Sequence, residues 1–156
     1  MNASYNDVFS RFLNKIEDFD MSKMSEEMFN GIASEYLHFA IGIPRIKKLF
    51  SSLSLDDVLL EFDYELKYSD DEQSDHDFIC NLLSSGMVLA WIEPQINSMT
   101  NIHQFYGGKE EKFYSQSNHL AELNKLKEKC EIDISRLINS RTYINNSYLR
   151  GNTNET

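Results

Sequence analysis

The chain contains few residues that interrupt a helix, with only six glycines and two prolines among its 156 residues. This composition favours long helices over a sandwich of short strands, which would need frequent turns. Aromatic residues make up 12% of the chain, so it can bury a core and does not have the composition of a disordered segment. We expect a mainly α fold, a small helical bundle with an extended arm or short β-hairpin and a long C-terminal helix.

Two amphipathic helices are predicted in the first third of the chain. Apolar residues recur at three- and four-residue spacing over residues 6–19, where Asn6 or Asp7 can cap the start. A second helix is predicted over residues 25–41, with the carboxylates of its first turn at the favourable end of the helix dipole. Gly42 and Pro44 then end it.

The middle of the chain predicts one short extended element. Residues 45–55 are loosely patterned and are interpreted as a connector. From Leu60 to Leu66 apolar and acidic residues alternate, which is the period of a strand, so residues 58–68 are predicted to be a short strand or extended arm. The acidic segment that follows is interpreted as a solvated turn.

Two further helices are predicted in the second half. Residues 74–93 are apolar nearly all round, so this helix and its Trp91 should be buried, and Pro94 should bend or end it. An extended connector is expected over residues 97–108. The last helix should run over residues 110–144, with an apolar stripe near the coiled-coil period. Residues 1–144 are thus expected to form one domain.

The polar residues 145–156 are expected to form a flexible C-terminal tail. The formal net charge of −10 argues against a protein that grips nucleic acid, because phosphate binding needs a basic surface. Cys80 and Cys130 lack the spacing of a metal or redox pair and are interpreted as buried thiols in a reducing compartment. No signal peptide or membrane-spanning segment is expected.

No pattern in the chain predicts catalysis. The acidic residues between 70 and 77 lack the glycine and the distal glutamate of a calcium loop, so no metal is expected. His76 lies between two aspartates, but no nucleophile pattern accompanies it, and the other histidines are far apart. The GGKEEK segment at 107–112 lacks the spacing of a phosphate loop. We therefore expect no enzyme activity and no cofactor.

Aromatic residues beside a pair of glycines suggest a docking segment. They would serve core packing or a subunit interface, since nucleobase stacking would need a basic groove. Together with the predicted arm and the tail, the candidate interface residues are Phe62, Tyr64, Leu66, Phe105, Tyr106, Gly107, Gly108, Phe113, Tyr114, Tyr148 and Leu149.

Residues 78–149 resemble a family of small phage proteins. The segments on which this resemblance is based are WIEPQIN, the connector after it, KFYSQSNHLAELNKL and NNSYL. They resemble proteins of the head-to-tail connector, or neck, of tailed bacteriophages. The resemblance implies a structural protein of the virion, made in the bacterial host cytoplasm, that forms a ring, commonly of twelve copies. Its partners would be the portal protein and another neck or tail protein. DNA would pass nearby without specific binding, and no membrane would be involved.

Two other functions are compatible with the sequence. The chain could be a helical adaptor or regulatory protein that binds another protein through its aromatic connector. A hydrolase or nuclease that uses the acidic cluster is the third possibility. The resemblance carries over no single functional residue, because neck proteins act through surfaces.

Overall fold

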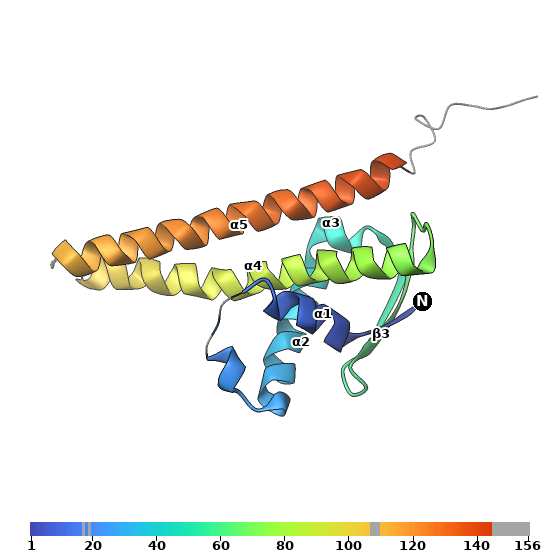
Figure 1. The fold of residues 1–156 in the computed structure, drawn as a ribbon, viewed down its shortest axis with the longest axis horizontal. Helices are drawn as coiled ribbons and strands as arrows, with labels where there is room; N and C mark the ends of the chain where they lie inside the picture. Colours follow the sequence, from blue (N-terminus) through green and yellow to red (C-terminus); the bar gives the residue numbers. More distant parts are fainter. Residues whose placement is uncertain (17, 19, 107–109, 145–156) are drawn as a thin grey trace, which may run out of the picture.

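Two antiparallel helices run the length of the molecule and are its longest elements (Figure 1). The computed structural model describes the backbone of residues 1–16, 18, 20–106 and 110–144, and the side chains of all of these except 22, 99–106, 110–116 and 144. Helices α4 (Glu72–Tyr106) and α5 (Glu110–Ile144) have 35 residues each. At 1.5 Å per residue, each is about 50 Å long. The mainly α fold with a β-hairpin and a long C-terminal helix is confirmed.

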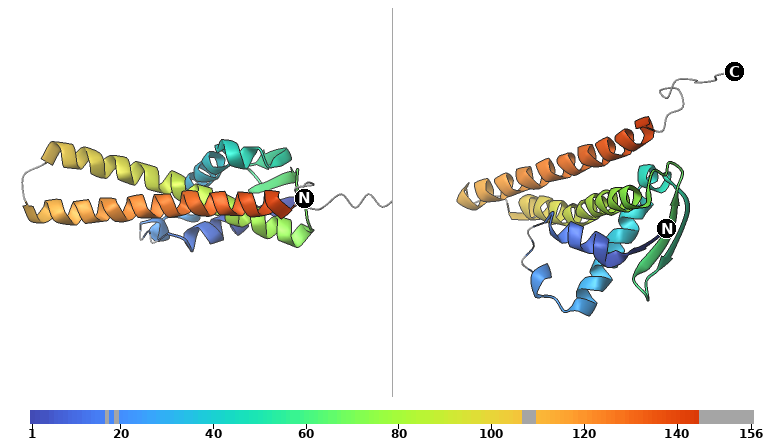
Figure 2. Two further views of the ribbon diagram at one scale, coloured as in Figure 1. Left: turned by 90° about the horizontal axis from the view of Figure 1, so that it is seen from above. Right: turned by 45° about the vertical axis from the view of Figure 1, so that its right-hand side comes forward.

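A smaller body packs against part of this helix pair. It contains α1 (Tyr5–Leu13), the 3₁₀ helix η1 (Met21–Lys23), α2 (Glu26–Gly42), the short α3 (Pro44–Lys47) and a three-stranded sheet. The views in Figures 1 and 2 show α1 and α2 crossing below α4, while the end where α4 and α5 are connected extends beyond the body.

Helix α2 forms nearly where it is predicted, whereas α1 is shorter than predicted. Ser25 caps α2 by accepting the backbone N–H of Met28 at 3.3 Å. Helix α1 is capped by Ser4 and ends at Leu13, six residues before the predicted end. The chain turns after Asn14, and further on the carboxylate of Asp18 accepts the backbone N–H groups of Asp20 and Met21, which replaces the helical pattern there.

The predicted strand lies at the centre of the sheet. Strand β3 (Glu61–Leu66) pairs antiparallel with both β1 (Asn2–Ser4) and β2 (Phe50–Asp56). Its apolar residues are buried and its acidic residues are exposed, as the alternation predicts. The interpretation of residues 45–55 as a connector is wrong, because they contain α3 and most of β2. An irregularity between Phe50 and Ser52 interrupts the strand pattern there.

Helix α4 continues through Pro94, so the predicted helix end at residue 93 and the extended connector over 97–108 are wrong up to Tyr106. A proline inside a helix removes one backbone hydrogen bond and costs about 3 kcal/mol. Packing against α5 offsets this cost. The ion pair of Lys127 with Glu93, at 3.6 Å, holds the two helices together next to the proline. Helix α5 has the predicted bounds.

The core lies where α1, α2 and the sheet meet the first half of α4. Trp91 is 8% exposed, which confirms its predicted burial. Helices α2 and α4 approach closely at Gly86, where an added Cβ atom would lie 2.7 Å from the Cβ atom of Ala40. The largest fully buried side chains come from these elements and from α3: Tyr5, Phe9, Phe12, Leu37, Ile46, Phe62, Tyr64, Ile79, Leu82, Leu83, Met87 and Ile92.

Candidate functional site

The three predicted interface residues of the arm belong to the core of the domain. Phe62 and Tyr64 are each 1% exposed and Leu66 is 9% exposed. Phe62 packs against the ring of Tyr5, and Tyr64 packs edge-on against Phe50. Of the two predicted alternatives the strand is confirmed and the extended arm is not, because strand alternation turns these side chains inward and they have partners inside the domain.

The other predicted interface residues lie at or beyond the limits of the described structure. The backbones of Phe105 and Tyr106 form the end of α4, and those of Phe113 and Tyr114 lie in the first turns of α5. Their side chains are outside the described set. Gly107 and Gly108, like Tyr148 and Leu149, lie outside the described residues altogether. The interface assigned to these residues stays a prediction.

Acidic residues in the first turns of α4 have structural roles. Asp75 is fully buried and forms an ion pair with Arg141 of α5, so the prediction of a solvated turn is wrong for this residue. Asp77 binds Arg11 of α1, and His76 lies 3.3 Å from Asp7. Across the described residues, no group of three or more histidine, cysteine or acidic side chains could hold a metal ion.

The two cysteines are buried free thiols. Burial raises the pKa of the Cys80 thiol to about 11 and also raises the pKa of Cys130. A thiol with a raised pKa is a poor nucleophile, because the thiolate is the reactive form. In the described part of the chain, no helix is both long and apolar enough to cross a membrane.

The most unusual surface feature is the turn that joins β2 to β3. Val58 is 91% exposed and Leu59 is 67% exposed, although both are aliphatic. The carboxylate of Asp56 accepts the backbone N–H groups of Val58 and Leu59 at 3.0 and 2.9 Å. This Asx-type turn fixes the backbone that carries the two exposed side chains. We call the pair Val58 and Leu59 the hydrophobic tip.

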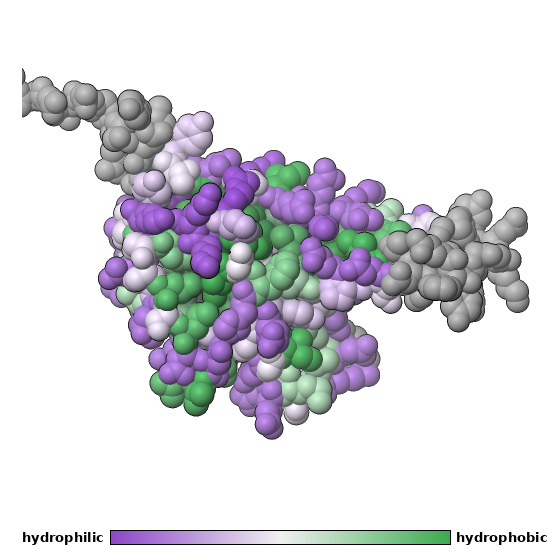
Figure 3. All heavy atoms as spheres, turned by 180° about the vertical axis from the view of Figure 1, so that it is seen from behind, coloured by the Kyte–Doolittle hydropathy of each residue, from purple (hydrophilic) through white to green (hydrophobic). Residues whose placement is uncertain are grey.

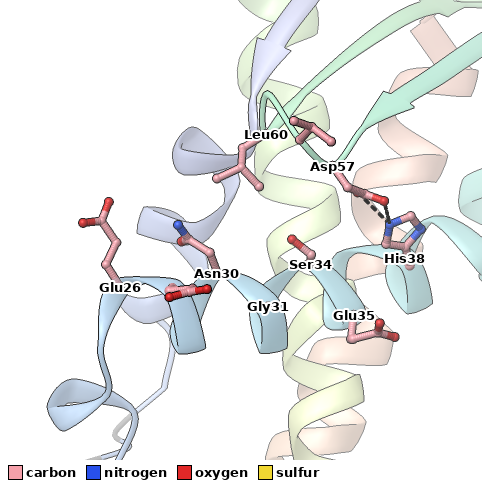
Figure 4. Close-up of a pocket in the computed structure, with 10 residues that line it drawn as sticks. Glu26, Asn30, Gly31, Ser34, Glu35, His38, Asp57 and Leu60 are labelled. Atoms are coloured by element: carbon pink, nitrogen blue, oxygen red, sulfur yellow. Dashed lines mark hydrogen bonds and ion pairs between the residues drawn. The ribbon is translucent and has the colours of Figure 1, made fainter.

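The body of the domain braces this turn from its inner side (Figure 4). Asp57 accepts a hydrogen bond from the Tyr5 hydroxyl at 2.7 Å. It also accepts one from Nε2 of His38 at 2.9 Å, which Figure 4 shows. These two hydrogen bonds, led by that from Tyr5, lower the pKa of the Asp57 carboxyl. The backbone N–H of Tyr5 donates to the carbonyl of Leu60 at 2.8 Å. Leu60 has φ 55°, a left-handed conformation that is uncommon for leucine.

A cleft of about 740 Å³ lies between the turn and α2, beside the contact of Asp57 with His38. Figure 3 shows a hydrophobic projection at the lower edge of the domain, at the end of the hairpin, with hydrophilic side chains next to it. Single exposed apolar side chains are common on protein surfaces, but a pair of neighbours on a braced turn presents a preformed contact. The carboxylates of Glu26 and Glu27 line the same cleft.

The cleft does not contain a catalytic arrangement. Ser34, His38 and Asp57 are the residue types of a hydrolase triad and all line it. Among the hydrogen bonds of the described residues, however, none joins Ser34 to His38, and a nucleophile must be in reach of its base. The His38–Asp57 contact instead holds the turn against α2. The hydrogen bonds of the described residues therefore assign His38 and Asp57 to the support of the turn.

The sequence contains one sign of the hydrophobic tip. The apolar run Val58–Leu60 precedes the strand alternation and follows two aspartates, which favour turns. Comparison with protein-family models, with curated proteins and with solved structures finds no match.

Proposed function

We propose that the chain is a structural subunit of a tailed-phage neck, where copies form a ring between portal and tail around the DNA channel. The observation that carries this proposal is the hydrophobic tip, because a braced turn with two exposed aliphatic side chains suits a contact to another protein. The resemblance of WIEPQIN and KFYSQSNHLAELNKL to neck proteins supports the kind of assembly.

The shape of the subunit also suits a closed ring. A ring subunit needs two different surfaces that complement each other, so that each copy contacts the next by the same rotation. The hydrophobic tip projects from the body, whereas the connected end of α4 and α5 extends away from it (Figure 1). The two features can thus contact different neighbours or different partners.

The exposed face of the sheet suits a position near DNA. Glu61, Asp63 and Glu65 alternate along β3 and all three are exposed. Successive residues on one face of a strand are roughly 7 Å apart, so these carboxylates form a row of negative charge. Such a row repels phosphates, which would let DNA pass without adhering.

Substitution of the hydrophobic tip tests the proposal. Val58→Ser with Leu59→Ser removes the exposed aliphatic groups but keeps the Asp56 and Asp57 contacts, so the domain should keep its melting temperature. Phage particles made with this variant should lack the subunit and should lack tails. Ile132→Ser is a matched control, because Ile132 is also exposed but lies on α5.

The outcome separates the neck function from the alternatives. Tailed particles that contain the tip variant at normal levels would contradict the proposal. An adaptor protein would form a small defined complex with its target and would be absent from purified wild-type particles. Replacing Phe105 and Tyr106 with serine tests the predicted connector interface in the same assay, and it should block incorporation while the isolated chain stays folded.

A further inference from the structure

A second surface, distant from the hydrophobic tip, has the form of a binding groove. It is a cavity of about 580 Å³ bordered by η1, α2, α4 and α5, close to the point where the helix pair leaves the body. Its apolar lining includes Met21, Met24, Ile32, Tyr36 and Trp91. We call this cavity the Trp91 groove.

The Trp91 groove has a fixed acidic edge. The indole N–H of Trp91 donates to Oδ2 of Asp18 at 2.7 Å, and Oδ1 of Asp18 accepts two backbone N–H groups. Partial burial opposes ionisation of Asp18, but these hydrogen bonds outweigh it and lower the pKa of the carboxyl. Asp20, which is exposed, also lines the groove. The occupant should therefore combine an aromatic or aliphatic anchor with a cation.

A segment of the same chain has this chemistry. Residues 145–156 follow α5 and lie outside the described residues. Tyr148 and Leu149 are the only large apolar side chains in that segment, and Arg150 is its only basic one. The anchors are therefore directly beside a guanidinium group that could pair with Asp18 or Asp20.

The anchors cannot reach the groove of their own chain. Ile144 ends α5, and Leu123, which lines the groove, lies 21 residues earlier on the same helix. At 1.5 Å per residue this is a distance of about 30 Å along the helix. Leu149 is five residues beyond Ile144, and five fully extended residues span at most about 18 Å. Docking must therefore occur between two copies.

We infer that the Trp91 groove binds residues Tyr148–Arg150 of a neighbouring copy of this chain. The hydrophobic tip of a neighbour fits less well, because its flanking Asp56 and Asp57 would face Asp18 and Asp20 and like charges disfavour contact. This inference deepens the proposed function, since it names one of the contacts that would join ring subunits. It connects the far end of α5 in one copy to the body of the next copy.

Trp91 allows a direct test, because it is the only tryptophan of the chain. A synthetic peptide of residues 145–156 is added to the full-length chain. Fluorescence is excited at a wavelength that tryptophan absorbs and tyrosine does not, and the emission of Trp91 is recorded. We expect a saturable change in the Trp91 emission. A peptide with Leu149→Ser should bind at least about tenfold more weakly, which is the effect of losing one buried aliphatic side chain.

A charge exchange tests the orientation of the segment. Asp20→Lys in the full-length chain should weaken binding of the natural peptide, and a peptide with Arg150→Glu should bind this variant better than it binds the natural chain. Asp20 donates its backbone N–H to Asp18 and accepts the N–H of Lys23 through its carbonyl, and neither bond uses the side chain, so the variant should fold. A natural peptide that leaves the emission unchanged, or a scrambled peptide that matches its effect, would overturn the inference.

The results distinguish this inference from the proposed function. If the peptide binds but the chain is absent from phage particles, the groove contact is supported and the proposed neck function is rejected. Incorporation without peptide binding would retain the neck and show that its subunits are joined elsewhere.

Discussion

Arg141, near the end of α5, forms an ion pair with Asp75, near the start of α4, and both side chains are buried. The guanidinium also donates to the carbonyl of Tyr68 and to the hydroxyl of Ser74, both at 3.2 Å, and lies 5.2 Å from the ring centre of Phe78. These contacts attach the end of α5 to the segment that leads from the sheet into α4.

Replacing Arg141 should strongly destabilise the domain. Arg141→Met leaves the carboxylate of Asp75 buried without its counter-ion, and breaking a buried pair in this way costs about 3–5 kcal/mol. Urea unfolding measures this loss. Arg136→Met is the control, because the side chain of Arg136 is 78% exposed and its pair with Asp133 should contribute less than about 1 kcal/mol. Equal losses for both variants would show that the Asp75 pair is not structurally important.

Two glycines on crossing helices should respond in opposite directions to alanine. Gly86→Ala places a methyl group 2.7 Å from the Cβ atom of Ala40, so α2 and α4 must move apart, at a cost of roughly 1–3 kcal/mol. Gly31→Ala meets no atom within 4 Å and removes the entropic penalty of a helical glycine, so it should stabilise by about 0.5–1 kcal/mol. Thermal unfolding of the two variants tests the close crossing. A Gly86→Ala variant as stable as the natural chain would refute it.

The hydrogen bonds of Asp57 that hold the β2–β3 turn should make the stability of the domain depend on pH. The folded-state pKa of Asp57 is lowered, so the unfolded chain binds this proton more readily than the folded chain does. Asp57 therefore contributes stability above about pH 4, the ordinary aspartate pKa, and this contribution is lost as the pH falls through the lower folded-state value. Denaturant unfolding should show that the free energy of unfolding falls less between neutral and acidic pH for Asp57→Asn than for the natural chain. The fall for Tyr5→Phe should lie between those of the natural chain and Asp57→Asn, because this variant removes one of the two hydrogen-bond donors to Asp57. Identical pH profiles for all three chains would contradict the brace.

Chelation should not affect stability. The carboxylates around the start of α4 are used in pairs with Arg11 and Arg141, and no three ligating side chains converge among the described residues. A specifically bound metal would stabilise the folded chain by mass action, so its removal would lower the melting temperature. We expect the melting temperature to be the same with and without a chelator. A fall that calcium or magnesium reverses would reject the prediction that no metal is required.

Periodicity predicts those elements whose sequence pattern is uninterrupted. The stripe through Leu123, Cys130, Ile134 and Leu137 predicts the bounds of α5, and its first three residues are buried. The alternation of Phe62, Asp63 and Tyr64 predicts β3. Strand β2 is missed because serines replace apolar residues along an edge strand and an irregularity shifts its register. The continuation of α4 past Pro94 depends on α5, which is distant in sequence.

The candidate site depends on contacts that a sequence pattern does not contain. Val58 and Leu59 are apolar, so by composition they are expected inside, and only the Asp56 turn and the left-handed Leu60 direct them outward. The brace joins Tyr5, His38 and Asp57 from three separate segments. Likewise, the burial of Asp75 depends on Arg141, which is 66 positions further along the chain.

The length of the α4–α5 pair has a mechanical consequence. Two helices that pack side by side resist bending, so α4 and α5 should move as one rigid rod. A small rotation of the body would then displace the connected end of the two helices. For an arm of about 30 Å beyond the crossing with α2, a rotation of about 5° moves that end by roughly 2–3 Å. This is comparable to the shifts that separate two packed arrangements at a subunit interface. A rotation of the body would therefore shift any molecule bound at the connected end of α4 and α5.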